Sequence, residues 1–552
     1  MKRVVSVLLL PLLFLGMSAW ADHHHHKHAA APAASTPPPL FEGLSALHHP
    51  VTTTVPDAQR YFDQGLRLIY AFNHDEATRA FKEATRLDPN CAMAYWGIAV
   101  TLGPNYNLPV DAERDRAAYE ALQKALALAP KASEAERAYI EALAKRHVAD
   151  PKADRKALDV AYADAMREVA KRFPEDIDAA TLFAEAMMNL RPWELWTMDG
   201  QPAPGTEEIV STLESVLQRN PEHPGAIHYY IHAVEASNQP GRAEPFADRL
   251  GELMPAAGHL VHMPSHIYIR TGRYHDAAEV NAKAAAIDAA YIEKYDIQGA
   301  YRLMYYPHNI HFFWASATLE GRSKEALQAA KDFATKLPVE MVRQMPMVEG
   351  FVPTYLFALV RFGKWQEVLK QPAPPADFKY STGMWHYARG LAFAATKRLD
   401  KATAEHKKLT EIMAATPPDA QVMMNSAAAL LQVAANVLGG EIAAKRRNVD
   451  EAVQLLEQAV RQQDALRYEE PPARYYPVRQ SLGAVLLKAG RVTEAEAVYR
   501  EDLRRNPENG WSLYGLTQSL RTQKKKEEAD ATNQRFRKAW AQADVKLTAS
   551  RF

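Results

Sequence analysis

The sequence predicts an all-α protein built as an array of helical hairpins. From about Val55 onward the chain alternates between helix, short turn and helix, with alanine at positions of close packing and proline after the second helix. Signals for β-strands are absent, because no stretch sustains a period-two alternation and no Asn-Gly turn joins two apolar runs. These two observations predict that apolar residues are buried by packing helix on helix.

The first element is expected to be a secretory signal covering residues 1–21. Lys2 and Arg3 precede an apolar stretch from Val4 to Leu15, and small residues lead to an expected cleavage after Ala21. No later segment is apolar over the roughly 20 residues that cross a bilayer, so we expect no transmembrane anchor. The signal is typical of bacterial export and predicts a periplasmic or secreted protein.

Residues 22–54 are expected to form a disordered linker rich in histidine, proline and alanine. The linker opens on a possible metal-binding tract made of His23, His24, His25, His26 and His28. After cleavage, the third residue of the chain is a histidine, which resembles the amino-terminal copper- and nickel-binding motif. The interrupting Lys27 and the position behind a natural signal favour a native segment over an expression tag.

The remaining residues, 55–552, consist of repeated helix–turn–helix units. One unit shows Gly65, Ala77, Phe81, Ala84 and Pro89, and another shows Ala495, Tyr499, Pro507, Trp511 and Gly515. Related turn-plus-helix starts recur near residues 73, 272, 321, 398, 448 and 490. These spacings resemble the tetratricopeptide repeat, a 34-residue unit with small residues where its helices touch. The resemblance covers nearly all of the chain beyond the linker and implies a right-handed superhelical solenoid with a concave groove.

Long loops inserted in the solenoid are candidate binding elements or lids. They cover residues 102–109, 190–205, 291–307 and 468–472. The side chains that could line the groove or close over it are Trp193, Trp196, Arg302, Tyr305 and Tyr306. For the two tryptophans, packing within their own loop is the favoured alternative. The arginine and the two tyrosines could orient an anion beside a metal.

Seven of the eight histidines from position 228 to position 311 form three groups with helical spacing, and His275 stands apart from them. The groups are His228-x3-His232 with Glu235, His259-x2-His262-x3-His266, and His308-x2-His311. Because an α-helix advances about 100° per residue, each group lies as a stripe on one helix. Imidazole is the commonest protein ligand of transition metals. The spacing therefore predicts a site for a divalent ion, zinc, copper, nickel or iron, where neighbouring helices bring the stripes together.

The resemblance to the repeat family implies where these histidines lie. In that family the groove is lined by the first helix of each unit, and all seven histidines fall on groove-lining positions. In this frame His228, His262 and His311 share one row, while His232 and His266 share a second row one turn further along. The same resemblance implies an alternative, since these grooves hold peptides and histidines can contact a peptide.

Composition excludes several classes of function. Without the two basic residues of the signal, 64 basic residues face 66 acidic ones, and this balance gives no support for nucleic-acid binding. The single cysteine, Cys91, excludes an internal disulfide. No Gly-x-Ser-x-Gly, phosphate loop or His-Glu-x-x-His motif is present.

Three functions remain open. The favoured one is an exported binding or scaffold protein that holds a protein or peptide partner in its groove and carries a histidine-rich metal site there. The second is a metal-dependent enzyme, a hydrolase or an oxidoreductase, that acts on a small molecule at the same histidines. The third is a periplasmic metal carrier or buffer fed by the amino-terminal histidine tract.

Overall fold

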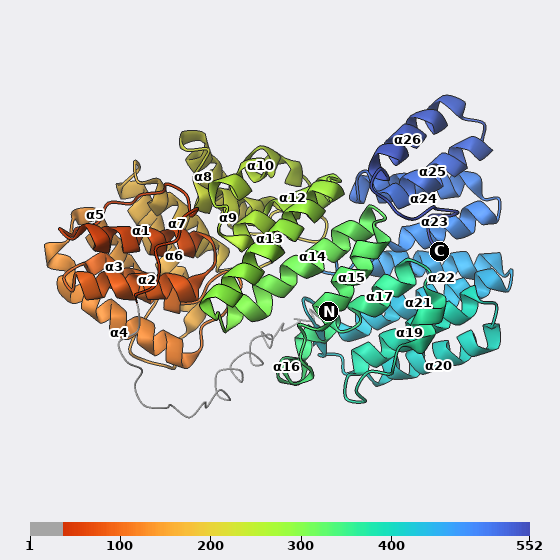
Figure 1. Cartoon of the computed structure of the whole chain (residues 1–552), viewed down its shortest axis with the longest axis horizontal. Helices are drawn as coiled ribbons and strands as arrows, with labels where there is room; N and C mark the ends of the chain where they lie inside the picture. The colour runs from red at the N-terminus through yellow and green to blue at the C-terminus, as the bar shows by residue number, and fades with distance from the viewer. Residues whose placement is uncertain (1–36) are drawn as a thin grey trace, which may run out of the picture.

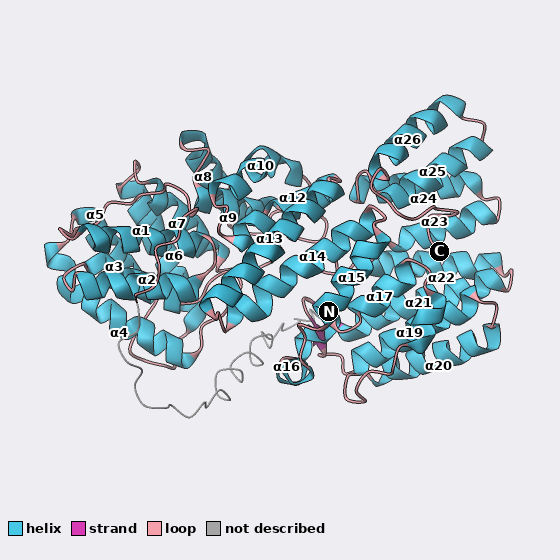
Figure 2. Ribbon diagram, viewed as in Figure 1, coloured by secondary structure: helices cyan, strands magenta, loops and turns pink. Residues whose placement is uncertain are grey.

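The computed structural model describes residues 37–552 and gives a chain that is almost entirely helical over that range (Figure 2). Twenty-six α-helices and a single two-stranded antiparallel sheet lie in the described residues. The all-α fold class is therefore confirmed. The chain runs from the red helices at one end of the molecule to the blue helices at the other (Figure 1). The predicted signal and the histidine tract His23–His28 lie outside the described residues.

The helices of the first half follow one another with short turns. They are α1 (Pro56–Tyr70), α2 (His74–Leu87), α3 (Ala92–Leu102), α4 (Ala112–Leu128), η1 (Ala129–Lys131), α5 (Glu134–Leu143), α6 (Arg155–Arg172), α7 (Ile177–Met188), α8 (Thr206–Arg219), α9 (Pro224–Val234), η2 (Pro240–Ala243), α10 (Glu244–Leu253), α11 (Gly258–His262), α12 (Pro264–Thr271) and α13 (Tyr274–Tyr295). Here η1 and η2 are short 3₁₀ turns.

The second half continues with a five-residue π-helical segment, η3 (Tyr301–Tyr305), and a 3₁₀ segment, η4 (Pro346–Phe351). Its other elements are α14 (Tyr306–Leu319), α15 (Ser323–Ala334), α16 (Val339–Gln344), α17 (Thr354–Arg361), α18 (Trp365–Lys370), α19 (Lys379–Ala395), α20 (Leu399–Ala415), β1 (Gln421–Val422), β2 (Asn425–Ser426), α21 (Ala427–Lys445), α22 (Val449–Asp464), α23 (Val478–Lys488), α24 (Val492–Arg505), α25 (Gly510–Thr522) and α26 (Lys526–Ala539).

Neighbouring helices touch through glycines that face an aromatic ring. A Cβ atom built on Gly65 or on Gly97 would lie 2.5 Å from the ring of Phe81, so α1 and α3 both press their backbones against this side chain of α2. Tyr499 of α24 is enclosed in the same way by glycines of α23 and α25, Gly483 and Gly515. The two units at opposite ends of the chain therefore share the packing of a tetratricopeptide-like repeat.

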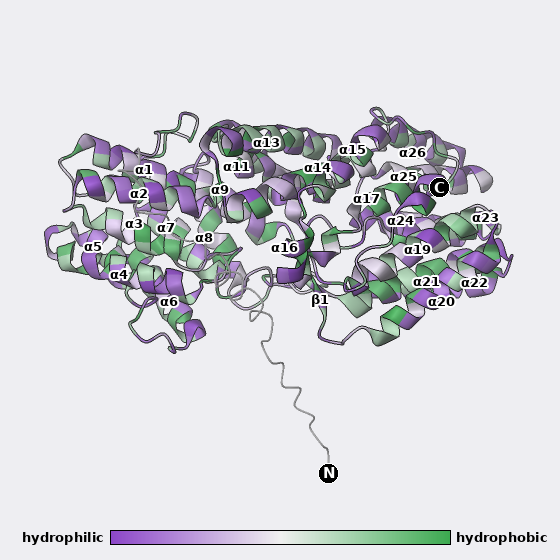
Figure 3. Cartoon of the chain, turned by 60° about the horizontal axis from the view of Figure 1, so that its bottom comes forward, coloured by the Kyte–Doolittle hydropathy of each residue, from purple (hydrophilic) through white to green (hydrophobic). Residues whose placement is uncertain are grey.

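Most helices carry one apolar face, and these faces join into continuous cores. Figure 3 shows hydrophobic and hydrophilic residues on different sides of the same helices. The two largest buried clusters run from Leu44 to Tyr305 and from Ile310 to Leu547, so the change from one core to the next falls at the start of α14. Helix α21 is apolar and long enough to cross a membrane, but 72% of its apolar window is buried, and it packs against α20 and α22.

Residues 37–54 carry no helix and lie against the solenoid, which differs from the linker expected there. Leu44 is 4% exposed within the first core. The Nδ1 atom of His49 lies 2.9 Å from a carboxylate oxygen of Asp178 on α7, and Thr52 donates its backbone N–H and its hydroxyl to Glu136 on α5. This segment therefore ties the first helices to units about 100 residues further along the chain.

The solenoid also folds back on itself in its second half. The indole N–H of Trp511 donates to the carbonyl oxygen of Thr318 at 3.2 Å, and the carboxylate of Asp544 accepts the backbone N–H of Ser323 at 2.8 Å. Between α22 and α23, the residue 466–472 loop returns to the first half, where Arg467 forms an ion pair with Glu194. These returning contacts bring residues from distant repeats to the functional site.

Replacing Gly97 by alanine is expected to destabilise the first units, because the new methyl group has no room beside Phe81. We expect the free energy of unfolding to fall by about 1–3 kcal/mol, although alanine favours a helix by about 1 kcal/mol over glycine. Urea unfolding followed by circular dichroism measures this change. Gly251→Ala on α10 is the matched control, since its Cβ would meet only one atom at an ordinary 3.7 Å. Equal losses of stability in both variants would contradict this account of the packing.

Candidate metal centre

The structure brings six of the seven predicted histidines into one cluster between adjacent helices. The cluster contains His228 and His232 of α9, His259 and His262 of α11, His266 of α12 and His308 of α14. Within this cluster, two sets of three histidines have all their ligand atoms within 4.8 Å of one another: His228, His232 and His259 form one, and His262, His266 and His308 form the other. Glu235, at the end of α9, forms a third set with His232 and His266.

The cluster is buried, in contrast to the open groove surface that was expected. His308 is half-buried, and the other five histidines and Glu235 are at most 3% exposed. The family frame placed these residues on the inner helices, and the inserted loops, which were candidate lids, cover them. A peptide lying in a groove would therefore not reach these side chains, which removes the expected alternative of direct peptide contact.

The tautomers of two histidines are fixed by oxygen atoms that can only accept a hydrogen bond. The Nδ1–H of His228 donates to the backbone carbonyl of Tyr70 at 2.7 Å. The Nδ1–H of His262 donates to Oδ1 of Asn281 at 2.6 Å, and Asn281 is itself oriented by donating its amide group to the carbonyl of Ala277. Both rings therefore carry their proton on Nδ1 and keep a lone pair on Nε2.

Glu235 fixes two further rings with its two carboxylate oxygens. Oε1 accepts from Nδ1 of His232 at 2.9 Å, and Oε2 accepts from Nδ1 of His266 in a shorter contact. The carboxylate therefore bridges α9 and α12 through their histidines. A histidine that ligates a metal through one nitrogen usually donates its other N–H to a carboxylate or a carbonyl, and four of the six rings follow this pattern.

The Nε2 atoms of the cluster face one another at distances that two ligands of one ion would have. Nε2 of His262 lies 2.9 Å from Nε2 of His266, and Nε2 of His228 lies 3.2 Å from Nε2 of His259. Two nitrogens bound to one tetrahedral ion at about 2.0–2.1 Å are about 3.3 Å apart. The buried Nε2 of His232 and Nδ1 of His259 have no hydrogen-bond partner in the described part of the chain. Buried lone pairs of this kind need a proton or a cation.

Protonation can satisfy only part of the cluster. Burial together with the neighbouring imidazoles lowers the pKa of His228, His259 and His262 well below the usual value of histidine, so these rings are neutral. His266 is the exception: burial alone would lower its pKa, but Glu235 and Glu470 raise it to about 10. In metal-free protein His266 therefore carries a second proton, which it can share with His262, while the first set of three histidines has no such proton.

Glu470 is a member of the site that the sequence did not reveal. Its carboxylate lies 3.1 Å from Nδ1 of His266 and is 1% exposed. It comes from the loop between α22 and α23, more than 200 residues beyond His266 in sequence. Burial raises the pKa of the Glu470 carboxyl to about 7. Burial would also raise the pKa of Glu235, but His266 and His232 outweigh this effect and lower it to about 2. The Glu-Glu-Pro-Pro composition of the loop was visible in the sequence, but its position was not.

Aromatic side chains close the cluster on several sides. The ring of Trp193 stacks on Tyr106 at 5.3 Å and meets His232 edge-on at 5.5 Å. Phe72 lies 4.4 Å from the ring of His228, and Tyr305 lies 4.7 Å from the ring of His259. Trp193 and Tyr305 therefore line the site. Tyr106 and Phe72 were not predicted, since each comes from a turn between helices of the first two units.

The other predicted groove residues lie apart from the histidines. The indole N–H of Trp196 donates to the carbonyl oxygen of Ala233 on α9, so this residue anchors the loop. Arg302 is exposed, and half-buried Tyr306 packs below the ammonium group of Lys336. No contact in the described residues places either of them beside the cluster.

His311 points away from the cluster, which differs from the predicted row His228, His262 and His311. Its ring stacks at 4.8 Å on Phe333 of α15 and at 5.0 Å on Trp314. Residues three apart on a helix differ by about 60° in direction, and this offset places His308 toward α12 and His311 toward the next unit. The preceding π-helical segment also changes the helical register ahead of α14. The second predicted row is present, with the rings of His232 and His266 5.4 Å apart.

Comparison with known proteins gives neighbours of the same helical type only. No protein-family model matches the chain, and no curated protein matches it. Among solved structures, the human IFIT1 dimer with m7Gppp-AAAA is 13% identical over 88% of this chain and 91% of that chain, with a TM-score of 0.34. The P58(IPK) TPR domain is 13% identical over 85% and 99%, with a TM-score of 0.22, and yeast Tom70 is 11% identical over 88% and 91%, with a TM-score of 0.26. The assignment of the fold rests on this chain's own helix pairs.

Diethyl pyrocarbonate, which modifies accessible imidazoles, is expected to distinguish the buried histidines from the exposed ones. In wild type, His48 and His275, whose side chains are 55% and 50% exposed, should react while the cluster is protected. Trp193→Ala should raise the rate at His232 by about tenfold, equivalent to about 1.4 kcal/mol of lost protection. Peptide mass spectrometry measures the rates, with the two exposed histidines as internal controls. Rapid modification of His232 in wild type would show that the site is open.

Proposed function

We propose that the protein is a helical-repeat solenoid that binds transition-metal ions at its buried six-histidine cluster. Each three-histidine set would hold one ion through ring nitrogens, and the two sets lie side by side because the rings of His232 and His266 are adjacent. The observation that carries this proposal is the fixed direction of four rings, whose Nδ1–H groups are committed to outer acceptors so that their Nε2 lone pairs converge.

The electrostatics of the cluster support a cation over an empty site. Converging lone pairs in a buried space repel one another unless a positive charge lies between them. Glu235 supplies a buried negative charge at the same place, with its pKa lowered to about 2 by His266 and His232 against the effect of burial. All-nitrogen ligation suits zinc, copper, nickel or iron, and thiolate ligands are absent from the described cluster.

A metal-dependent enzyme is the second candidate, and burial favours it over a metal carrier. Three nitrogens leave one position of a tetrahedral ion open, as catalytic sites do. A carrier needs exposed ligands that exchange ions, whereas five of these six histidines are buried and Tyr106 and Trp193 pack against His232. A hydrolase and an oxidoreductase both remain compatible with this arrangement.

Export and a protein or peptide partner complete the proposal. The amino-terminal sequence supports bacterial export to the periplasm or beyond. The tetratricopeptide-like packing supports a protein-binding or scaffold role for surfaces away from the histidines, although a fold of this kind does not by itself define a function. The tract His23–His28 would collect metal ions close to the solenoid.

Metal analysis tests the main proposal directly. Full-length protein with the tract histidines 23–26 and 28 changed to serine should retain about two ions per chain after incubation with a metal mixture and desalting, if each set holds one ion. His228→Ala/His259→Ala should lose one of them, and His262→Ala/His308→Ala should lose the other. Plasma mass spectrometry gives both the number and the identity of the ions.

The matched control is His311→Leu, which removes a histidine from the same helix as His308 but outside the cluster. Its metal content should equal that of the parent. Equal, low metal content in the parent and in both double variants would refute the metal centre.

Glu235→Gln is expected to weaken metal binding without removing a ring. An amide offers only one acceptor oxygen, so either His232 or His266 must give up its present tautomer. Loss of such an outer partner costs about 10- to 100-fold in metal affinity. Competition with a chromophoric chelator measures the change. Glu405→Gln is the control, because Glu405 accepts from His386 in the same manner, far from the cluster in the second half. Unchanged affinity in Glu235→Gln would contradict the role assigned to this carboxylate.

A further inference from the structure

A second group of buried polar side chains, in the second half of the solenoid, consists of arginines instead of histidines. Arg361 at the end of α17 is 4% exposed, and Arg474 in the loop before α23 is 5% exposed. The guanidinium carbon of Arg361 lies 3.5 Å from the ring centre of Trp511 and 5.0 Å from that of Tyr476. Arg474 packs against the same tyrosine, 5.3 Å from its ring centre. Aromatic rings therefore hold both cations rigidly in place.

These arginines have few acceptors within the described residues. Arg361 donates to the amide oxygen of Gln480 at 2.7 Å, and its buried Nε–H has no partner. Arg474 donates to the hydroxyl of Tyr387, while its Nε and Nη1 groups are buried without partners. Burial lowers the pKa of Arg361 to about 9, against the opposing effect of the neighbouring tyrosines and Asp502. A buried guanidinium normally pairs with a carboxylate or a phosphate.

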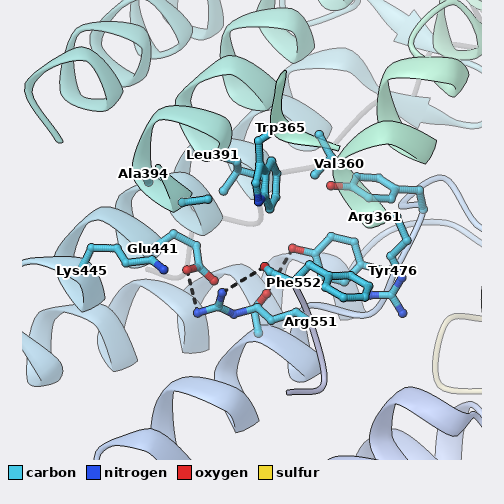
Figure 4. A pocket seen from close by; sticks show the side chains of 13 residues that line it. Val360, Arg361, Trp365, Leu391, Ala394, Glu441, Lys445, Tyr476, Arg551 and Phe552 are labelled. Carbon is cyan, nitrogen blue, oxygen red and sulfur yellow. Dashed lines mark hydrogen bonds and ion pairs between the residues drawn. The ribbon is translucent and has the colours of Figure 1, made fainter. Parts of the chain in front are cut away.

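A half-open cavity lies beside Arg361 (Figure 4). Its polar wall is formed by Arg361, Lys445, Arg551 and Glu441, and the one ion pair among them joins Arg551 to Glu441 at 2.8 Å. The apolar wall includes Trp365, Leu391, Ala394 and Phe552. Three cationic side chains therefore line the cavity beside one side-chain carboxylate, and Arg551 also donates to the backbone oxygen of Phe552 at 3.5 Å.

Another carboxylate close to Arg361, that of Asp502, is already used inside the protein. Asp502 is fully buried and accepts hydrogen bonds from the side chains of Ser512 and Asn509. It reaches Arg361 only through Gln480, whose amide group lies 3.5 Å from its carboxylate. The cavity wall consequently keeps an excess of positive charge.

We propose that this cavity binds a small organic carboxylate, whose charged group pairs with Arg361 and whose apolar part packs against Trp365 and Leu391. The planar guanidinium presents parallel N–H groups that match both oxygens of a carboxylate. Arg551, whose Nε–H is also buried without a partner, supplies a second cation at the rim. The site is independent of the histidine cluster and needs no metal.

Calorimetric titration of the full-length protein with phenylacetate tests this assignment. Phenylacetate carries an apolar ring and one carboxylate, and phenylacetamide is its uncharged analogue of the same shape. Phenylacetate should bind saturably, and phenylacetamide should bind about 10- to 100-fold more weakly, the range that charge-assisted hydrogen bonds provide. Equal binding of the two, or no binding of phenylacetate, would overturn the proposal. Phenylphosphonate, titrated in place of phenylacetate, shows whether a doubly charged head group fits better than a carboxylate. Binding of phenylphosphonate without binding of phenylacetate would also overturn the proposal of a carboxylate site.

Variants then locate the bound anion. Arg361→Met should weaken phenylacetate binding by about 10- to 100-fold, and Arg361→Lys should restore part of it, because lysine keeps the charge but loses the paired N–H groups. Arg551→Gln at the more exposed rim gives a second variant that does not disturb the buried stack. Arg273→Met, which removes an arginine stacked on Tyr268 in the first half, should leave binding unchanged. Full affinity in both Arg361→Met and Arg551→Gln would place the anion elsewhere and refute the site.

Discussion

The arrangement of the histidine cluster depends on one buried carboxylate, Glu235. An ionised carboxylate removed from water costs several kcal/mol unless donors surround it, and here two imidazole N–H groups supply them. The same two bonds set the tautomer of His232 and His266 and connect α9 to α12. The contacts of Glu235 with these two histidines contribute little stability by themselves. They nevertheless fix the direction in which the Nε2 atoms of His232 and His266 point, and a metal ion needs ligand atoms with fixed directions.

The parts of this site that the sequence predicted are those that obey helical periodicity. His228, His232 and Glu235 share one helix face, and a spacing of three or four residues is sufficient to place them together. The second group, on α11 and α12, is correct for the same reason. The fold class was also predicted from the spacing of residues along helices. Glycines such as Gly65 recur where an aromatic ring of the next helix packs against the backbone. The prediction that His311 joins the cluster is wrong, because a difference of about 60° in direction on one helix decides which neighbouring helix a side chain contacts.

The remaining parts depend on the path of the chain between units. Glu470 and Trp193 lie on inserted loops, and no local pattern specifies which helix such a loop meets. Glu470 returns to a histidine about 200 residues earlier in the chain, and Trp193 meets one about 40 residues later. Their contacts convert an expected groove into a closed interior, with the indole of Trp193 over His232. The burial of the histidine cluster therefore changes the interpretation of its function more than the identity of any single candidate metal ligand does. Under the proposed function, the histidines would hold an ion inside the protein, and a larger partner would bind the outer surfaces.

The two buried polar groups of the solenoid pose opposite electrostatic problems. Within the histidine cluster, buried ring nitrogens of His232 and His259 lack a hydrogen-bond partner, which a cation would relieve. Around Arg361, guanidinium N–H groups converge beside aromatic rings and lack an acceptor, which an anion would relieve. Neither problem can be solved by repacking apolar residues, because a buried polar atom without a partner costs about 1–3 kcal/mol whatever surrounds it. A protein that keeps both groups buried is most simply explained by two ligands of opposite charge, each bound within one half of the same helical array.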